Sequence, residues 1–487
     1  MTNTIASQNR RWLGLFAILA ATIMNLLDAN IVGVAAPAIR ADLGGSYSTL
    51  QWLAAAYTLA LAVGLLTGGR LGDMYGRKRM LLIGIGGFVL ASLACTAAWS
   101  PESLVAFRVL QGLFGAAMIP QGFGLIRDLF PPQEMGKAFG TFGPIIGLST
   151  IAGPVVAGLL TDHAGWRSVF AINLPIGLFA FIAGVVALPR SSGARALRLD
   201  ATGALMAGVG MMLLVYPLVQ GRELGWPAWT FATLAAAVLV LAAFVTYQVR
   251  RKRAGRTPLV ELSVFAKRSY TSGVVFVLVF FGAIVGFSLA VGLYLQLGLG
   301  QSPVRAALTM SAWAVGAFVG SGVAATNPRL GRKLLHIGLS IMTVALAGLT
   351  VVFSGTPTGG WGLALPLFAY GLGMGMIFVP LFDIIMGDVA GHEVGSAAAM
   401  LESLQQMGAS LGVSILGTVF FTAIGTQFTP SGSMHASYVV TLVALALTVA
   451  AFGLGFLLPK QARSHAPAPA GASTGAPVVE TREPALV

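Results

Sequence analysis

The chain has 487 residues, of which 56% are hydrophobic and only 9% are charged, whereas a soluble domain carries about a quarter charged residues. A chain with so few charged residues could not cover a surface that faces water, so the composition indicates a membrane protein. The single cysteine, Cys95, excludes a disulfide framework and a cysteine-based metal cluster. The five histidines are scattered without ligand spacing, so neither a metal nor a cofactor is expected.

Apolar stretches of about 20 residues, the length of a membrane helix, follow one another along the chain. Charges, prolines and glycine clusters divide them into fourteen predicted spans: residues 12–34, 50–72, 80–99, 103–126, 137–160, 168–188, 200–220, 228–249, 270–296, 304–325, 333–354, 361–386, 395–424 and 435–458. The first stretch is too long for a signal peptide and lacks a clear cleavage site, so we expect a retained span. The predicted fold class is an all-α membrane protein with fourteen transmembrane helices.

Basic residues give these spans an orientation. With the N-terminus inside and sides alternating, 24 of the 29 Lys and Arg residues lie inside, four lie outside and Arg108 lies within a span. The positive-inside rule then predicts a cell (inner or plasma) membrane protein with both termini cytoplasmic. The orientation of the spans in the membrane therefore explains the net charge of +13, and no nucleic-acid binding is expected. Residues 250–256 are interpreted as a polar connection that touches anionic lipid.

A weak internal repeat predicts the domain organisation. Residues 76–84 and 331–338 both begin with Gly-Arg-Lys and open a helix from a short basic loop. We therefore expect two pseudo-symmetric six-helix bundles, residues 1–190 and 269–460, related as parallel repeats. Residues 191–268 would form an inserted transmembrane helix pair with its linkers. The tail, 461–487, is rich in Pro, Ala and Gly and is predicted to be disordered.

Four charged residues fall inside predicted spans, where a charge costs about 2.5–3.5 kcal/mol on insertion scales. Asp28 and Arg108 lie at similar depth, which allows an ion pair or a shared water cavity. Burial and a nearby cation have opposite effects on proton binding by a carboxyl, so such a group can exchange protons near neutral pH. The alternatives are a proton or substrate pathway and a permanent structural ion pair.

Glu402 lies near the middle of its span. Gln405 and Gln406 follow at helical spacing and extend its polar face. This stripe predicts either a cavity wall or a hydrogen bond between helices. Asp383 is closer to the inner end of its span, so it lies on the pathway or only reaches cytoplasmic water.

Glycines predict close helix packing. Gly64, Gly68 and Gly72 share one helical face, which lets another backbone approach. The glycines of residues 371–375 have the spacing of a nucleotide-binding loop. They lie in an apolar helix with no preceding strand, so nucleotide binding is rejected.

Five motifs in chain order together resemble the major facilitator superfamily, and within it the fourteen-span drug:proton antiporter branch. They are residues 27–39 in the first span, 69–79 after the second, 108–112 in the fourth, Gly147, Gly153, Pro154 and Gly158 in the fifth, and 166–177 leading into the sixth. The fifth-span motif is similar to the antiporter motif, which importers of the superfamily generally lack. The resemblance implies alternating access, with Asp28 and Arg108 near the proton or substrate path.

The resemblance also implies an inner gate. Asp73, at the cytoplasmic end of the second span, would face the N-terminus of the thirteenth, where a helix dipole favours an anion. Arg77 or Arg127 would complete a charge relay that latches the gate. The alternative is an ordinary solvated loop charge.

The predicted function is a proton-coupled antiporter that exports small amphiphilic compounds, either drugs or a self-made metabolite. The alternative is a proton-coupled importer of the same fold. A channel would need a filter, usually built by several subunits. An enzyme would need a nucleophile with a base or a metal cluster. The expected partners are a small-molecule substrate, protons and membrane lipid, and we expect a monomer that is not an enzyme.

Overall fold

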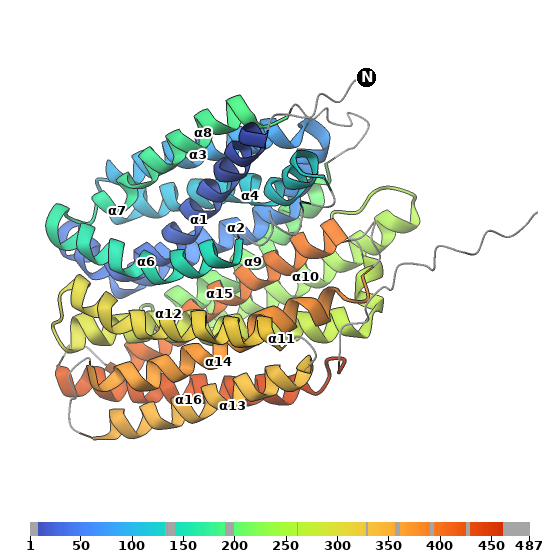
Figure 1. Cartoon of the computed structure of the whole chain (residues 1–487). Coiled ribbons are helices and arrows are strands. Elements are labelled where there is room, and N and C mark those ends of the chain that lie inside the picture. The colour runs from blue at the N-terminus through green and yellow to red at the C-terminus, as the bar shows by residue number, and fades with distance from the viewer. Residues whose placement is uncertain are drawn as a thin grey trace, which may run out of the picture.

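The computed structural model describes residues 8–131, 134, 142–189, 199–260, 262–327, 330–355, 361–389, 394–424 and 429–460. Within these ranges the chain is helical and contains no strand, and the long helices lie side by side along a common direction (Figure 1). Thirteen described stretches are long and apolar enough to cross a membrane. The predicted span 137–160 overlaps a further helix, but residues 137–141 and the side chains of 142–152 lie outside the described part.

The helices follow the predicted order. The first group comprises α1 (Gln8–Leu43), α2 (Tyr47–Tyr75), α3 (Arg77–Thr96), α4 (Pro101–Leu129), α6 (Phe142–Ala164), α7 (Ser168–Ala171) and α8 (Asn173–Ala187). Two helices follow, α9 (Ala201–Gln220) and α10 (Ala228–Arg253). After a 3-10 segment, η1 (Leu262–Ala266), the last group comprises α11 (Arg268–Leu293) with a π-helical end, η2 (Tyr294–Gly298), α12 (Pro303–Thr326), α13 (Arg332–Ser354), α14 (Trp361–Met386), α15 (Val394–Ile424) and α16 (Pro430–Gly455).

Two helices differ from the predicted spans. Helix α1 runs on to Leu43, through Pro37, because neighbouring helices can compensate for a proline in a membrane helix. The sixth predicted span, 168–188, is confirmed as one apolar stretch, Ser168–Ala187, within which the turn residue Ile172 separates α7 from α8. Pro175 lies in the first turn of α8, where no N–H is needed. The prediction of a polar connection at 250–256 was wrong for residues 250–253. These basic residues form the last turn of α10, where the helix dipole favours cations.

The two groups form separate layers in Figure 1, with α1–α8 above and α11–α16 below. Contacts between the groups are made by α2 with α15, α6 with α12, and α1 with α11 and α12. Helix α9 packs against α10 and also against α2 and α15. It therefore lies beside the seam that joins the two groups.

A cation covers the end of the last helix in each group. Lys78 Nζ donates to the Leu188 carbonyl at 2.7 Å, directly after α8. Arg332 Nη1 donates to the carbonyls of Phe456 at 2.9 Å and Leu458 at 2.7 Å, directly after α16. The last carbonyls of a helix lack intrahelical partners, so both cations act as caps. We call this end of the molecule, where α1, α3, α11 and α13 begin, the basic end.

The predicted close approach of another backbone to the glycines of α2 is confirmed, and the structure shows that the partner is α4. A Cβ atom added to Gly68 would lie 2.1 Å from the carbonyl oxygen of Ala116, far inside contact distance. The glycines of α14 serve the same purpose. A Cβ at Gly371 would lie 2.0 Å from the Trp313 carbonyl, and one at Gly375 would lie 2.0 Å from the Ala317 carbonyl, both on α12. Backbone packing therefore accounts for the glycines that look like a nucleotide loop.

A seam of small residues joins α15 to α2 across the two groups. Ser403 Oγ donates to the Ala62 carbonyl at 2.6 Å, and Ser410 Oγ donates to the Ala55 carbonyl at 3.3 Å. Gly417, again seven residues further along, lies against Gln51. A repeat of seven is the spacing at which two helices stay in contact while coiling gently around each other.

A buried carboxylate, Asp200, connects the start of α9 to the end of α10. Asp200 is 2% exposed and accepts hydrogen bonds from the Gly203 N–H at 3.0 Å, Tyr247 Oη at 3.0 Å and Gln248 Nε2 at 2.8 Å. Arg251 Nε lies 3.5 Å from the same carboxylate. Burial alone would raise the pKa of Asp200, but these hydrogen bonds and the Arg251 charge hold it below its usual value.

Candidate functional site

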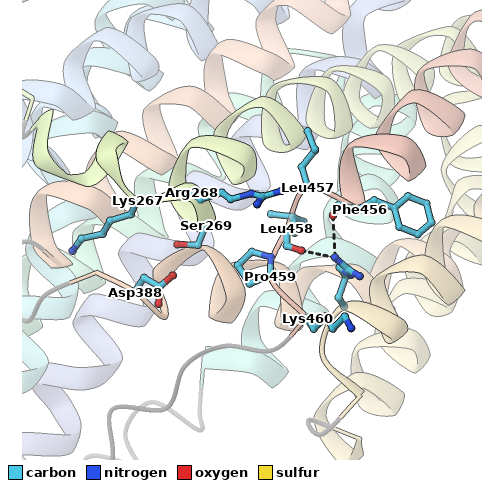
Figure 2. Close-up of a pocket in the computed structure, with 10 residues that line it drawn as sticks. Lys267, Arg268, Ser269, Asp388, Phe456, Leu457, Leu458, Pro459 and Lys460 are labelled. Carbon is cyan, nitrogen blue, oxygen red and sulfur yellow. Dashed lines mark hydrogen bonds between the residues drawn. The ribbon is translucent and has the colours of Figure 1, made fainter.

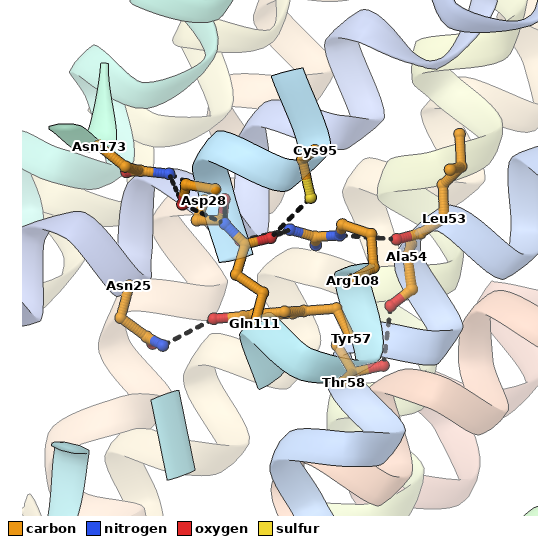
Figure 3. A network of polar contacts seen from close by, with 11 residues as sticks. Asn25, Asp28, Leu53, Ala54, Tyr57, Thr58, Cys95, Arg108, Gln111 and Asn173 are labelled. Carbon is orange, nitrogen blue, oxygen red and sulfur yellow. Dashed lines mark hydrogen bonds and ion pairs between the residues drawn. The ribbon is translucent and has the colours of Figure 1, made fainter. Parts of the chain in front are cut away.

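Asp28 on α1 and Arg108 on α4 form an ion pair inside the first helix group (Figure 3). Their side chains are 0% and 1% exposed, so neither charge reaches solvent. Arg108 Nη1 donates to Asp28 Oδ2 and, at 2.8 Å, to Gln111 Oε1, while its Nε donates to the Leu53 carbonyl at 3.1 Å. The structure thus brings together the two charges that the sequence places at similar depth.

The second carboxylate oxygen of Asp28 is also occupied. Gln111 Nε2 donates to Oδ1 at 2.8 Å, and Asn173 Nδ2 donates to it at 3.1 Å. Gln111 Nε2 also donates to Ser92 Oγ at 2.8 Å, and the orientation of the Gln111 amide is fixed by Arg108, which can only donate and bonds to Oε1. The side chains that bond to Asp28 therefore all act as donors. An unprotonated carboxylate is the group that this arrangement fits.

Aromatic rings complete the surroundings of the cation. The Arg108 guanidinium carbon lies 4.2 Å from the centre of the Tyr57 ring and 5.9 Å from that of Phe170. Such contacts stabilise a desolvated guanidinium by roughly 2 kcal/mol. Asn25 Nδ2 donates to Tyr57 Oη at 2.6 Å, which holds the ring in place. The site is therefore a neutral unit built from α1, α2, α3, α4 and α8, in which Asn173 Oδ1 is buried without a hydrogen-bond partner.

Several members of this site had no predicted role. Gln111 and Asn173 lie in motifs of the sequence, and the position of Gln111, three residues after Arg108, already places both on one helical face. Tyr57 on α2 and Ser92 and Cys95 on α3 carry no such signal, because they lie on other helices than Asp28 and Arg108. Cys95, which is buried and free, lies with its sulfur 3.7 Å from Gln111 Oε1.

The acidic residues of the second group lie apart from this pair. Glu402 is half-buried, and Gln406 Nε2 donates to its Oε1 at 3.4 Å. Gln405 Oε1 is buried without a hydrogen-bond partner, so the predicted polar stripe contains one unsatisfied acceptor. Asp383 is exposed, which fits the alternative in which it reaches water.

The gate residues lie at the basic end. Arg77 Nη2 is 3.4 Å from Asp73 Oδ1, and Arg77 Nη1 is 3.8 Å from Asp128 on α4. Gly124 makes room for Arg77, because a Cβ there would lie 2.6 Å from its side chain. The side chain of Arg127 lies outside the described residues. In the described part of the chain, the ion pairs of Asp73 stay within the first helix group.

Helix α6, which carries the predicted antiporter motif, contacts the second group at the end opposite to the basic end. A Cβ at Gly158 would lie 2.8 Å from the Pro303 carbonyl at the start of α12. One turn further, Asp162 Oδ2 accepts a hydrogen bond from the Val304 N–H at 3.3 Å. Gly153 is buried and Pro154 is half-buried within α6, while the surroundings of Gly147 lie outside the described residues.

Membrane-length helices in two packed groups, with a buried ion pair in one of them, define a multi-pass membrane transporter. Residues 18–413 match the Major Facilitator Superfamily, and the chain belongs to this family. The family predicted from the five motifs is thereby confirmed.

Known relatives are similar over most of their length. The chain is 47% identical over 446 residues to a probable actinorhodin transporter of Streptomyces coelicolor, covering 90% of this chain and 77% of that protein. It is 36% identical to a tetracenomycin C resistance and export protein of Streptomyces glaucescens, covering 86% and 78%. It is 37% identical to a puromycin resistance protein of Streptomyces alboniger, covering 92% and 90%.

Solved structures agree in fold. The crystal structure of an auto-inhibited peptide transporter of the POT family superposes with a TM-score of 0.69, covering 94% of this chain and 99% of that one. A D-xylose–proton symporter gives 0.63, covering 92% and 97%. The sequence identities, 14% and 16%, limit these two likenesses to the fold.

Proposed function

We propose that the protein is a proton-coupled antiporter that exports small amphiphilic compounds, antibiotics or a self-made metabolite, across the plasma membrane. The names of the three relatives support export, since one is called a transporter, one a resistance and export protein, and one a resistance protein. The observation that carries proton coupling is the buried Asp28 carboxylate, held by Arg108 and neutral donors. A buried ionisable residue of this kind in a membrane protein is a functional candidate by default.

The geometry supports a proton cycle. When Asp28 takes up a proton, Arg108 loses its counter-ion but keeps two neutral acceptors, the Leu53 carbonyl and Gln111 Oε1. The cation therefore stays bonded while the net charge of the site changes from zero to positive. Such a change can bias the equilibrium between two arrangements of the helix groups. Protons would enter from outside, and substrate would leave in exchange.

Alternating access is supported by where the groups touch. Asp162 and Val304 join α6 to α12 at the end opposite to the basic end. The gate residue Asp73, at the basic end, pairs with Arg77 of its own group. We infer a state closed on the outside, in which the latch between Asp73 and α15 is released. This inference takes the basic end as cytoplasmic, in line with the positive-inside rule.

The finer architecture is proposed on the same basis. We infer that α6, the fifth span in chain order, also crosses the membrane and raises the number of spans from thirteen to fourteen. We also infer that residues 1–190 and 269–460 are two six-helix bundles of a monomer. Residues 191–268 would be the inserted pair, which agrees with the packing of α9 against α2, α15 and α10. Glu402, Gln405 and Asp383 would belong to the pathway on the side of the second bundle.

The test starts with a compound to which the protein confers resistance in cells. Addition of this compound to purified protein in weakly buffered detergent should release protons, and Asp28→Asn should abolish the release. Full release from Asp28→Asn, equal to that of the unmodified protein, would assign the proton to another carboxyl. Uptake into everted vesicles driven by an imposed pH gradient distinguishes export from import, because an importer would accumulate the compound in right-side-out vesicles instead.

The gate is tested separately with Asp73→Asn, which removes a charge but little volume. If the latch stabilises one of the two states, this variant should insert normally and transport at a clearly lower rate. Asp128→Asn is the matched control, since it also removes a carboxylate that faces Arg77. Equal transport by Asp73→Asn and the unmodified protein would make Asp73 an ordinary surface charge.

A further inference from the structure

A cavity of about 750 Å³ lies at the basic end of the second helix group, remote from the Asp28 site (Figure 2). Its walls come from the start of α11, the start of α13, the segment that follows α16 and Asp388, directly after α14. Four basic side chains and one acidic side chain line it: Lys267, Arg268, Arg332, Lys460 and Asp388. The excess of positive charge points to an anionic ligand.

Two of the cations are available to such a ligand. Arg332 is occupied in capping α16, as its bonds to the Phe456 and Leu458 carbonyls show. Arg268 and Lys460 are exposed, and neither side chain has a hydrogen bond or ion pair in the described part of the chain. Both line the same cavity.

A buried hydroxyl supplies an independent sign of a missing partner. Ser269 lines the same cavity, is 1% exposed and has no hydrogen-bond partner for its Oγ. It lies in the first turn of α11, a helix of 26 residues whose N-terminus favours a negative charge. A buried hydroxyl without a partner is unfavourable, and a phosphate oxygen would satisfy it.

In the first helix group, basic side chains of the protein occupy the corresponding region at the basic end. There Arg10, at the start of α1, donates through Nε and Nη2 to the Val186 carbonyl at 3.1 and 2.9 Å. Lys78 donates to the Val185 and Leu188 carbonyls at the end of the same helix, α8. In the second group Arg332 makes the corresponding bonds, and the cavity lies beside it.

We propose that this cavity binds a phosphate group, and specifically the headgroup of an anionic phospholipid. Arg268 and Lys460 would contact the phosphate, and Ser269 would donate to one of its oxygens. Phe456 and Leu457, which are 57% and 47% exposed beside the cavity, offer an apolar surface to the glycerol and the upper acyl chain. This apolar wall favours a lipid over a free phosphate compound. The ligand would connect α11, α13 and the end of α16.

The experiment measures binding of phosphatidylglycerol and phosphatidylcholine, each with a fluorescent acyl chain, to the purified full-length chain in detergent. Phosphatidylglycerol should bind more tightly, because it lacks the choline cation. Arg268→Gln combined with Lys460→Gln should weaken its binding by about tenfold or more. The control, Arg253→Gln combined with Arg256→Gln, removes two charges from the same end outside the cavity and should change binding by less than about twofold.

Ser269→Ala provides a variant that should fold well, because it removes a hydroxyl without a partner. It should weaken phosphatidylglycerol binding about threefold while leaving the lipid-free thermal stability unchanged or higher. Competition with millimolar glycerol 1-phosphate separates the two sources of phosphate. Complete displacement would assign the site to free phosphate compounds and overturn the lipid assignment, whereas retention of the lipid supports it. Equal loss of binding in the cavity and control variants, or equal binding of both lipids, would overturn the site.

Discussion

The Asp28 network can be tested as a unit, because its hydrogen bonds have a fixed direction. Arg108→Ala removes the donor to Asp28, Gln111 Oε1 and the Leu53 carbonyl and leaves a buried carboxylate without its cation. Breaking a buried ion pair in this way costs about 3–5 kcal/mol. We therefore expect a clear fall in the thermal stability of the purified protein. A change below about 1 kcal/mol, the range of an exposed pair, would refute the reasoning that the pair is desolvated.

Asp28→Asn carries a second cost, which complicates its use as a neutral variant. The new amide group at position 28 would direct its N–H₂ toward Arg108 or toward Gln111 and Asn173, all of which are donors. Such a mismatch of donors costs about 1–3 kcal/mol. Loss of transport in this variant alone would not separate lost proton binding from lost stability.

A relocated carboxylate separates the two effects. Asp28→Asn combined with Gln111→Glu keeps one carboxylate beside Arg108, because Gln111 Oε1 already lies 2.8 Å from Arg108 Nη1. The new carboxylate at position 111 can accept from the new amide and from the Ser92 hydroxyl, so most of the lost stability should return. Transport driven by a pH gradient should stay lost if position 28 itself carries the proton. A double variant that is both stable and fully coupled would show that the position of the carboxylate is not essential.

Three further outcomes are expected. Gly68→Ala should destabilise the protein by about 1–3 kcal/mol in thermal unfolding, because its Cβ would lie 2.1 Å from the Ala116 carbonyl. The control, Gly69→Ala, should be neutral, because its Cβ would lie 3.8 Å from the nearest atom. Equal effects of the two substitutions would contradict backbone contact at Gly68. The pKa of Asp200 is lowered in the folded protein, so its contribution to stability is present above its unfolded pKa of about 3.9 and is lost as pH falls through the folded pKa. Asp200→Asn should therefore reduce the fall in melting temperature between pH 7 and about pH 3. An unchanged fall would assign the pH dependence to other carboxyl groups. Arg253→Cys should resist an impermeant thiol reagent added outside cells, and labelling from outside would contradict the proposed orientation.

The order of the helices could be predicted from hydropathy because each span must supply about 20 apolar residues of its own. The ends were harder to predict, since a proline or a basic run does not by itself end a helix. Pro37 lies within α1, and Arg250 to Arg253 complete α10. The turn residue Ile172 was not predictable, because a single residue leaves the hydropathy of the span Ser168–Ala187 unchanged.

The site was partly predictable for a similar reason. Asp28 and Arg108 are conspicuous because charges are rare inside spans. Their neutral partners are ordinary polar residues, and only the packing of α3 and α8 against α4 and α1 shows that Ser92 and Asn173 point at the pair. The repeat of Gly-Arg-Lys was informative about topology but not about roles. It aligns Arg332 with Arg77, whereas Lys78 is the residue that caps a helix as Arg332 does.

The seam between α15 and α2 imposes a strict register on any change in chain length. Ser403, Ser410 and Gly417 meet α2 only because whole heptads separate them. Inserting or deleting one residue between Ser403 and Ser410 would rotate the rest of α15 by about 100° relative to α2. Bulky side chains would then enter the seam, and the serine hydroxyls would lose their carbonyl acceptors. Natural variation in this helix should therefore proceed by substitution, while insertions and deletions accumulate in the loops.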